Sequence, residues 1–229
     1  MTKHIGIVAC SYEGASLCYQ SICREAPKYL GRHAHPEISM HNHPLAEYMK
    51  YIDKDDWQGV ANLMLSSAKK LIIAGADILI CPDNTIHQAF PFLIDQLTIP
   101  WLHIAEAVAT VANEKNYKKP GILGTKYLME GPVYPLHLEN KKILYEIPTL
   151  KQRNYINDVI FDELVNGIIK EESKKGYLSI IDDLKARGCD AVVLGCTEIP
   201  LLVFPHESSL PVLDSTRILA SAALEAATA

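Results

Sequence analysis

The chain has 229 residues, of which 48% are hydrophobic and 21% are charged, and its formal net charge is -5. This composition is typical of a globular protein with a real core. Lysines and arginines are scattered along the chain, so the basic patch that binds nucleic acid or an anionic membrane is excluded, and we expect neither partner.

The first residues, MTKHIGIVACSYEG, enter a predicted strand at once and lack the apolar region of a signal peptide. No run approaches the ~18 apolar residues of a membrane span. We therefore expect a cytoplasmic protein. The six cysteines include no C-x-x-C pair, which argues against a disulfide framework or a zinc site, and the histidines form no convincing metal site. We expect no metal.

Short apolar runs alternate along the chain with longer segments of helical periodicity. This alternation predicts an α/β fold with mostly parallel strands. The clearest helices are expected at 56–75, 154–170 and 176–188. Strands are expected at IGIVAC, EISMHN, ILIC, WLHI, GILG, ILYEI, AVVLGC and VLDS.

Three phrases of the first half recur in the same order in the second half. HIGIVACSYEG is echoed by KPGILGTKYLMEG, GADILICPDN by GCDAVVLGCT, and IPWLHIAEAVATVA by LPVLDSTRILASAA. Such spacing favours an internal repeat, although parallel α/β units share strand-and-turn patterns without one. We expect two pseudo-symmetric α/β lobes, 1–98 with 211–229 and 99–210, with the last helix packed on the first lobe.

The second of these echoes aligns Asp83 with Cys196, each in a polar turn after a buried strand. Ligands of parallel sheets bind beyond the carboxyl ends of the strands, so we expect both turns at one cleft between the lobes. Two proton carriers on opposite faces of a carbon next to a carboxylate could invert it. A thiol suits this task when neighbouring amides lower its pKa.

Six segments of the chain carry a further signal: ILICPDNTIH, TIPWLHIAEA, PGILGTKYLMEGPVY, YINDVIFDELVNGIIK, LGCTEIPLL and LPVLDSTRILA. Together, in order and over nearly the full length, they resemble the aspartate/glutamate racemase superfamily of cofactor-independent enzymes. The resemblance implies an amino-acid racemase or epimerase that needs no cofactor, acts on a small molecule and forms a homodimer. The absence of a G-x-G-x-x-G motif or a P-loop agrees with the expectation of no nucleotide cofactor.

The resemblance also assigns site residues. Cys196 matches the second catalytic cysteine, and the turn residues that hold the substrate's carboxylate and amino group match Asn84, Thr85 and Thr197. Thr125 is a further expected contact. The loop after the first strand, CSYEGAS, departs from the family's glycine-rich loop, so Cys10, Ser11 and Glu13 carry over poorly, although Ser11 is still expected to line the cleft.

Asp83 departs from the family, which usually has its first catalytic cysteine at this position. Asp83 is a carboxylate base opposite Cys196, a ligand of the substrate's amino or other cationic group, or a loop residue without a role. Cys81, two residues earlier, is expected to pack at the strand end. A carboxylate facing an acidic substrate is unfavourable, so Asp83 weakens the assignment of aspartate or glutamate.

A second departure concerns the groups that would hold a distal carboxylate. After the second strand the family's arginine is absent, and His41 and His43 are either cationic contacts or loop histidines. Lys170 is the nearest lysine on the later helix. His87 either tunes the Asp83 turn or is a capping or satisfied buried histidine, and Glu198 is expected to favour a helix dipole.

Three functions stay open from the sequence. The first is a racemase or epimerase that exchanges the α-proton between Cys196 and Asp83. The second is a single-cysteine decarboxylase or cis–trans isomerase of the same superfamily. The third is a non-catalytic amino-acid-binding protein. The substrate's side chain and its preferred enantiomer are not specified by these residues.

Overall fold

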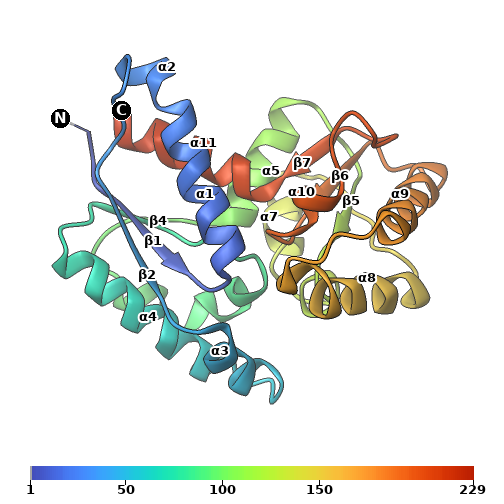
Figure 1. Ribbon diagram of the computed structural model, residues 1–229, viewed down its shortest axis with the longest axis horizontal. Helices are drawn as coiled ribbons and strands as arrows, with labels where there is room; N and C mark the ends of the chain where they lie inside the picture. The colour runs from blue at the N-terminus through green and yellow to red at the C-terminus, as the bar shows by residue number, and fades with distance from the viewer. Residues whose placement is uncertain (1) are drawn as a thin grey trace. The chain divides into compact units, whose positions relative to one another are not determined.

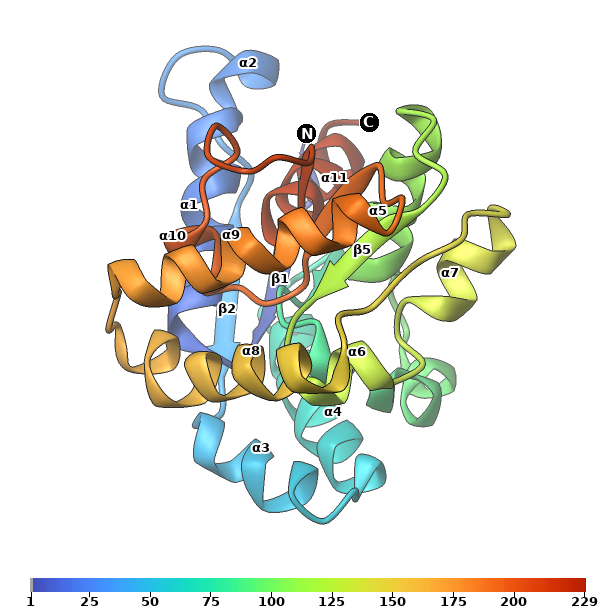
Figure 2. The ribbon, with the colours of Figure 1, turned by 90° about the vertical axis from the view of Figure 1, so that its right-hand side faces the viewer.

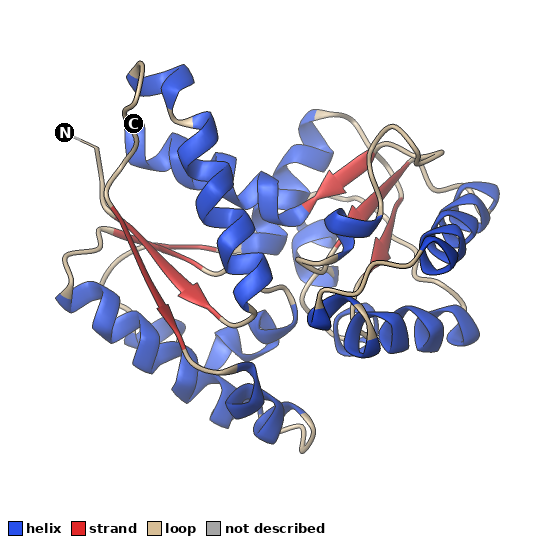
Figure 3. Ribbon diagram, viewed as in Figure 1, coloured by secondary structure: helices blue, strands red, loops and turns tan. Residues whose placement is uncertain are grey.

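A computed structural model describes residues 2–229. Within these residues the chain forms two compact units (Figure 1), unit 1 from residues 2–104 and 216–229 and unit 2 from residues 105–215. Each unit contains a parallel sheet with helices around it (Figure 3). The α/β class expected from the sequence is therefore confirmed. Among the described residues, no helix has both the length and the apolar character that crossing a bilayer requires.

Unit 1 is built on a parallel sheet of four strands in the order β2-β1-β3-β4. Apolar side chains of β1 and β3 pack against helices α1 and α11, whereas the opposite face meets α4. The bounds are β1 Ile5–Ala9, β2 Ile38–Asn42, β3 Ile78–Ile80, β4 Trp101–Leu102, α1 Tyr12–Glu25, α4 Trp57–Ile73 and α11 Ser215–Thr228.

Unit 2 has a parallel sheet of three strands in the order β5-β6-β7, namely Pro120–Leu123, Ala191–Leu194 and Val212–Asp214. Its core packs the sheet against α8 (Leu150–Asp162) and α9 (Glu171–Ala186). These two helices lie side by side in Figure 2. Tyr155 of α8 and Tyr177 of α9 have ring centroids 6.4 Å apart. α5 (Ile104–Glu114) leads from unit 1 into this unit.

The two sheets are equivalent in strand order and in strand pairing. β1-β3-β4 and β5-β6-β7 have the same order, and the echoes of the sequence fall on equivalent pairs. These pairs are Gly6↔Leu79 and Leu79↔Trp101 in unit 1, and Gly121↔Val192 and Val192↔Val212 in unit 2. The helix before each central strand also ends on a left-handed glycine, Gly75 (φ +95°) or Gly188 (φ +87°). The pseudo-symmetry predicted from the sequence is confirmed.

The unit boundaries lie later than the predicted 98/99 and 210/211. β4 pairs with β3 and so belongs to unit 1, whereas β7 pairs with β6 and belongs to unit 2. The helices after these strands, α5 and α11, then pass into the other unit. α11 packs in the unit 1 core, and Lys3 N donates to Ala227 O at 2.9 Å.

Two predicted elements are shorter than expected. The segment ILYEI touches β5 through the single bridge Gly121↔Glu146, so it is an extended edge and not a strand. The helix expected at 154–170 ends at Asp162, and after a short 3-10 helix the chain turns at the left-handed Gly167. The remaining helices are α2 Pro27–Leu30, α3 Leu45–Ile52, η1 Thr85–Phe92, η2 Ile94–Gln96, α6 Lys126–Glu130, α7 Pro135–Asn140, η3 Leu164–Asn166 and α10 Ile199–Leu202.

Candidate functional site

The carboxyl ends of the unit 1 strands gather three of the predicted site positions. Ser11 follows β1, His41 lies near the end of β2, and Asp83 follows β3. Because these strands are parallel and paired, their carboxyl ends form one edge of the sheet. Ser11 is buried there as the N-cap of α1, and its Oγ accepts from Gly14 N at 3.3 Å.

The Asp83 turn is held by hydrogen bonds at its carboxylate and its carbonyl. Asp83 Oδ1 accepts from Ile86 N at 3.2 Å, and Asp83 O accepts from His87 Nδ1 at 2.7 Å. Trp101 Nε1 donates to His87 Nε2 at 3.4 Å. A carbonyl can only accept and an indole N–H can only donate, so His87 is neutral with its hydrogen on Nδ1. His87 is thus a buried histidine that fastens the turn.

Asn84 and Thr85 complete this turn at the start of η1, where both are buried. Cys81 lies behind it, fully buried, with Sγ 3.8 Å from Asp83 O. Burial raises the pKa of the Cys81 thiol well above its usual range, and the negative charge of Asp83 raises it further. The packing interpretation of Cys81 therefore fits its surroundings.

The corresponding edge of unit 2 carries Thr125 after β5 and Cys196 after β6. Thr125 is the N-cap of α6, and its Oγ1 accepts from Leu128 N at 3.2 Å. Cys196 Sγ donates to Glu198 Oε2 at 2.9 Å. Thr197 Oγ1 donates to the same Glu198 oxygen at 2.7 Å. All of these side chains are nearly buried, and the cysteine is 9% exposed.

Glu198 does not have the expected role of an acidic residue that favours a helix dipole. It precedes the four-residue helix α10, which is too short for a strong dipole, and its carboxylate instead binds the thiol and the hydroxyl before it. Its Oε1 is buried and has no hydrogen-bond partner among residues 2–229. The sequence Cys196-Thr197-Glu198 could have indicated the contact between Cys196 and Glu198, because a turn brings residues two positions apart close together.

His41 and His43 form a polar cluster between β2 and α4. His41 Nδ1 lies 3.0 Å from Ser67 Oγ, and Lys70 Nζ lies 2.9 Å from His41 Nε2. Desolvation lowers the pKa of His41, and the charge of Lys70 lowers it further. Desolvation and Lys70 likewise lower the pKa of His43. Both rings are neutral at pH 7, so the cation at this place is Lys70, which the sequence did not single out.

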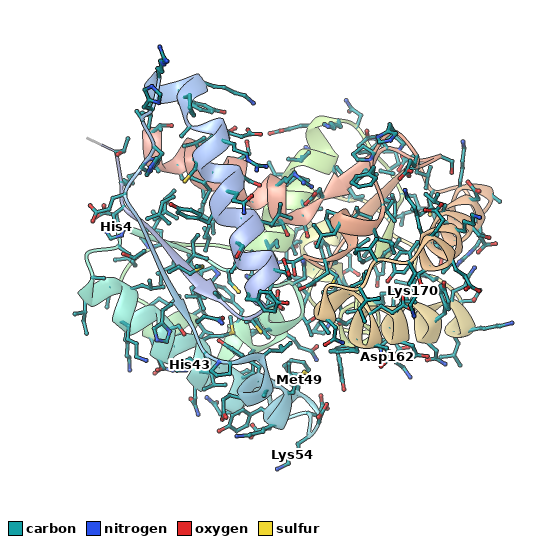
Figure 4. All side chains as sticks on the ribbon, in the orientation of Figure 1. His4, His43, Met49, Lys54, Asp162 and Lys170 are labelled. Atoms are coloured by element: carbon teal, nitrogen blue, oxygen red, sulfur yellow. The ribbon has the colours of Figure 1, made fainter. Side chains whose placement is uncertain are left out.

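Figure 4 places His43 at the end of β2 beside α3, which carries Met49, whereas His4 lies at the opposite end of the sheet. The same view labels Lys170 and Asp162 in unit 2. Lys170 Nζ contacts Glu163 Oε1 at 3.1 Å on an exposed surface. The charge of Lys170 is therefore paired with the Glu163 carboxylate.

The cysteines of the chain are all in thiol form. Within residues 2–229 there is no group of three or more His, Cys, Asp or Glu side chains placed to hold a metal ion. Two cysteines lie at the strand-end edges besides Cys81, namely Cys10 after β1 and Cys196 after β6.

Comparison with known proteins gives a consistent family. The family model described as Asp/Glu/Hydantoin racemase matches residues 7–223. A candidate Asp/Glu racemase from Yersinia pestis is 34% identical with a TM-score of 0.90, covering 99% of this chain and 100% of that one. An aspartate racemase homologue from Pyrococcus horikoshii is 27% identical with a TM-score of 0.85 over 99% and 100%.

Glutamate racemase from Persephonella marina is 28% identical over 170 residues. That match covers 68% of this chain and 60% of the relative, so the chain matches less than two thirds of the relative's length.

Proposed function

The chain belongs to the Asp/Glu/Hydantoin racemase family, and from this premise we propose that it is a cofactor-independent amino-acid racemase or epimerase. The observation that carries the proposal is the hydrogen bond from Cys196 Sγ to the buried Glu198 carboxylate. A thiol held by a carboxylate on a strand-end turn is equipped to give and take a proton. The relatives named above, described as racemases, support the same reaction class.

In this proposal Cys196 serves one face of the substrate's α-carbon. Glu198 Oε2 accepts from both Cys196 and Thr197, so it fixes the direction of the thiol and offers an acceptor for its proton. As a thiolate, Cys196 abstracts the α-hydrogen, and as a thiol it returns a proton to the planar intermediate. One C–H bond breaks and another forms, so no redox partner is needed.

The second proton carrier comes from the strand-end edge of unit 1, where the sequence pointed to Asp83. Its carboxylate is held by Ile86 N and its carbonyl by His87, so the turn is rigid. The polar side chains of Asn84, Thr85, Thr125 and Thr197, together with the turn amides, stabilise the charge that develops on the substrate carboxylate. Ser11 and His41 complete the expected substrate contacts.

The substrate is an amino acid or a related carboxylate. At the β2 edge of unit 1, His41 and His43 are neutral at pH 7, and Lys70 is hydrogen-bonded to His41. Asp83 adds a carboxylate at the same sheet. Recognition of an acidic side chain by this unit is therefore weaker than an arginine in place of His41 would make it, and neutral amino acids belong in any substrate panel.

A test uses proton-to-deuterium exchange at the α-carbon in heavy water, followed by NMR over a panel of L- and D-amino acids. The proposal expects exchange with inversion in the wild type and no inversion in Cys196→Ala. The two other functions give different products. A decarboxylase releases carbon dioxide from a disubstituted malonate, and a binding protein protects a ligand without exchanging its α-hydrogen. Binding without exchange would contradict the proposal.

A further inference from the structure

The unit 1 edge holds a thiol that the proposed reaction has not used. Cys10 directly follows β1, is 2% exposed, and precedes the N-cap Ser11. Through the internal repeat, Cys10 corresponds to Thr125, just as Asp83 corresponds to Cys196. At the position of the unit 2 thiol, Cys196, unit 1 therefore has the carboxylate Asp83. The unit 1 thiol, Cys10, lies instead at the end of the neighbouring strand β1.

The pairing of the strands brings Cys10 and Asp83 to the same edge. Ile7 of β1 lies opposite Ile80 of β3, and Cys10 and Asp83 each follow three residues later on these parallel strands. The two side chains belong to chain segments that leave the sheet side by side.

A buried phenol lies near both groups. Tyr48 of α3 is fully buried, and desolvation raises its pKa. Electrostatic interactions with Cys10, Cys81 and Asp83 raise the pKa of Tyr48 further, in that order. Such interactions weaken with distance, so Cys10 and Asp83 both lie within electrostatic range of the Tyr48 hydroxyl.

We propose, on the basis of the proposed function, that Cys10 is the second proton carrier and that Asp83 is the carboxylate that positions and deprotonates it. Each unit then contains one thiol–carboxylate couple, Cys10 with Asp83 and Cys196 with Glu198. In unit 2 the carboxylate follows the thiol on one turn. In unit 1 the two groups come from neighbouring strands.

The chemistry favours the thiol as the carrier. An unperturbed aspartate has a pKa of ~3.9 and a thiol ~8.5, so a thiolate is by far the stronger base toward an α-hydrogen. The Asp83 carboxylate takes the Sγ proton of Cys10, and the thiolate takes the α-hydrogen as a proton, leaving its electron pair on the carbon. The Cys196 thiol then gives its proton on the opposite face and becomes a thiolate.

The first experiment compares Cys10→Ala with Cys18→Ala in the rate of α-carbon inversion. Cys18 is also buried in unit 1, but it packs in the core against α11 and β1, so it controls for loss of a buried thiol. General acid–base catalysis is worth about 10²–10⁴-fold, so Cys10→Ala is expected to lose at least about 10²-fold, while Cys18→Ala stays within about threefold. Wild-type inversion in Cys10→Ala, together with loss in Asp83→Asn, would overturn the proposal and make Asp83 itself the carrier.

The second experiment does not depend on turnover. Iodoacetamide labelling of Cys10 at pH 7 is measured by peptide mass spectrometry in the wild type and in Asp83→Asn. Removing a neighbouring negative charge lowers the thiol pKa, so labelling of Cys10 should become severalfold faster in the variant. Cys23, farther along α1 and partly exposed, is the internal control and should label equally.

Equal labelling of Cys10 in both proteins would refute the couple, whatever the enzyme does. If the wild type exchanges no α-hydrogen but Cys10 labelling responds to Asp83, the proposed reaction fails while the couple stands. The two failures are therefore distinguishable.

Discussion

The turn after β3 and the turn after β6 occupy equivalent places but are built differently. In unit 2, Gly195 N donates to Leu123 O at 2.7 Å, and a Cβ on Gly124 would lie 2.9 Å from Gly195 O. The equivalent residues of unit 1 are Ala9 and Pro82. Proline has no N–H, so the corresponding bond cannot form. A shared scaffold thus tolerates divergence at its strand-end edge, where the candidate site lies.

The largest expected effect on inversion comes from replacing Cys196, the thiol on the unit 2 turn. Cys196→Ser keeps the size of the side chain but replaces the thiol with a hydroxyl, which is a far poorer acid at neutral pH. Inversion should fall by about 10²–10⁴-fold, with the free energy of unfolding nearly unchanged. Chiral chromatography of the products and urea denaturation measure the two quantities. A variant that inverts at the wild-type rate would remove Cys196 from the reaction.

A methyl group between the unit 2 strand ends should have the next largest effect. In Gly195→Ala the Cβ would lie 2.8 Å from Leu123 O and 2.5 Å from Leu128 Cδ2, so β5 and β6 must separate just before Cys196. We expect inversion to fall by roughly 10²-fold, because small displacements of a catalytic group are costly. Pro82→Ala, the equivalent change in unit 1, has no such contact to break and should have the smaller effect on inversion. Equal effects would show that the close approach is unimportant.

The equivalent glycines inside the two sheets allow a comparison of stability alone. In Gly6→Ala the new Cβ would lie 2.9 Å from Ala76 Cβ and 2.8 Å from Leu79 Cδ2. In Gly121→Ala it meets Leu184, with Cδ1 at 2.8 Å, and a leucine side chain can rotate away. Overpacking costs about 1–3 kcal/mol, so we expect Gly6→Ala at the upper end and Gly121→Ala at the lower end. Chemical denaturation of both variants measures this, and the reverse order would contradict it.

The smallest expected difference is in pH dependence. Burial alone would raise the pKa of Glu146, but the hydrogen bond from Lys119 and the charges of Arg187 and Lys119 outweigh it, so the pKa of Glu146 is lowered. A lowered carboxylate pKa stabilises unit 2 above the unfolded value near 4.5, and this stabilisation is lost as the pH falls through the folded value.

In unit 1 the lowered pKa of His41 acts in a higher window. Below the unfolded value near 6.5 the unfolded chain binds the proton more readily, so unit 1 loses stability as the pH falls from 6.5 toward the folded value. Burial also lowers the pKa of His137 in unit 2, so hydrogen exchange of β1 and β5 peptides at pH 7, 5.5 and 4 should show an upper step in both units and a lower step in β5. His41→Gln should reduce the upper step in β1, with His43 carrying the remainder, and Glu146→Gln should reduce the lower step in β5. An unchanged upper step of β1 in His41→Gln would contradict this assignment.

Much of the scaffold could be predicted from the sequence because it depends on local signals. Gly75 and Gly188 end helices, and alternating apolar and helical segments specify parallel α/β units. The unit boundaries could not be predicted, because the choice of sheet for Trp101 and Val212 depends on pairing between distant strands. The sequence of a single strand does not indicate which other strand it will pair with.

The positions of the candidate site residues in the fold were predictable in part for the same reason. Cys196 and Asp83 stand on turns that directly follow strands, so their sequence context indicates their place. Lys70 contacts His41 from a helix distant in the sequence, so this contact appears only in three dimensions, whereas the contact between Cys196 and Glu198 had a signal in the C-T-E spacing. The sequence did not place Cys10 in the site, because its loop departs from the family pattern. The pairing of β1 with β3 shows that Cys10 and Asp83 leave the sheet on neighbouring strands.

The most direct test of two thiol–carboxylate couples is α-deuterium exchange of each enantiomer separately in Cys196→Ser and Cys10→Ser. A protein with one remaining carrier can exchange the α-hydrogen of only the enantiomer that presents it to that carrier. The account predicts that inversion falls by at least about 10²-fold in both variants and that each still exchanges one enantiomer, the opposite one in the two variants. Retention of exchange for both enantiomers in Cys10→Ser, or loss of the same enantiomer in both variants, would contradict it.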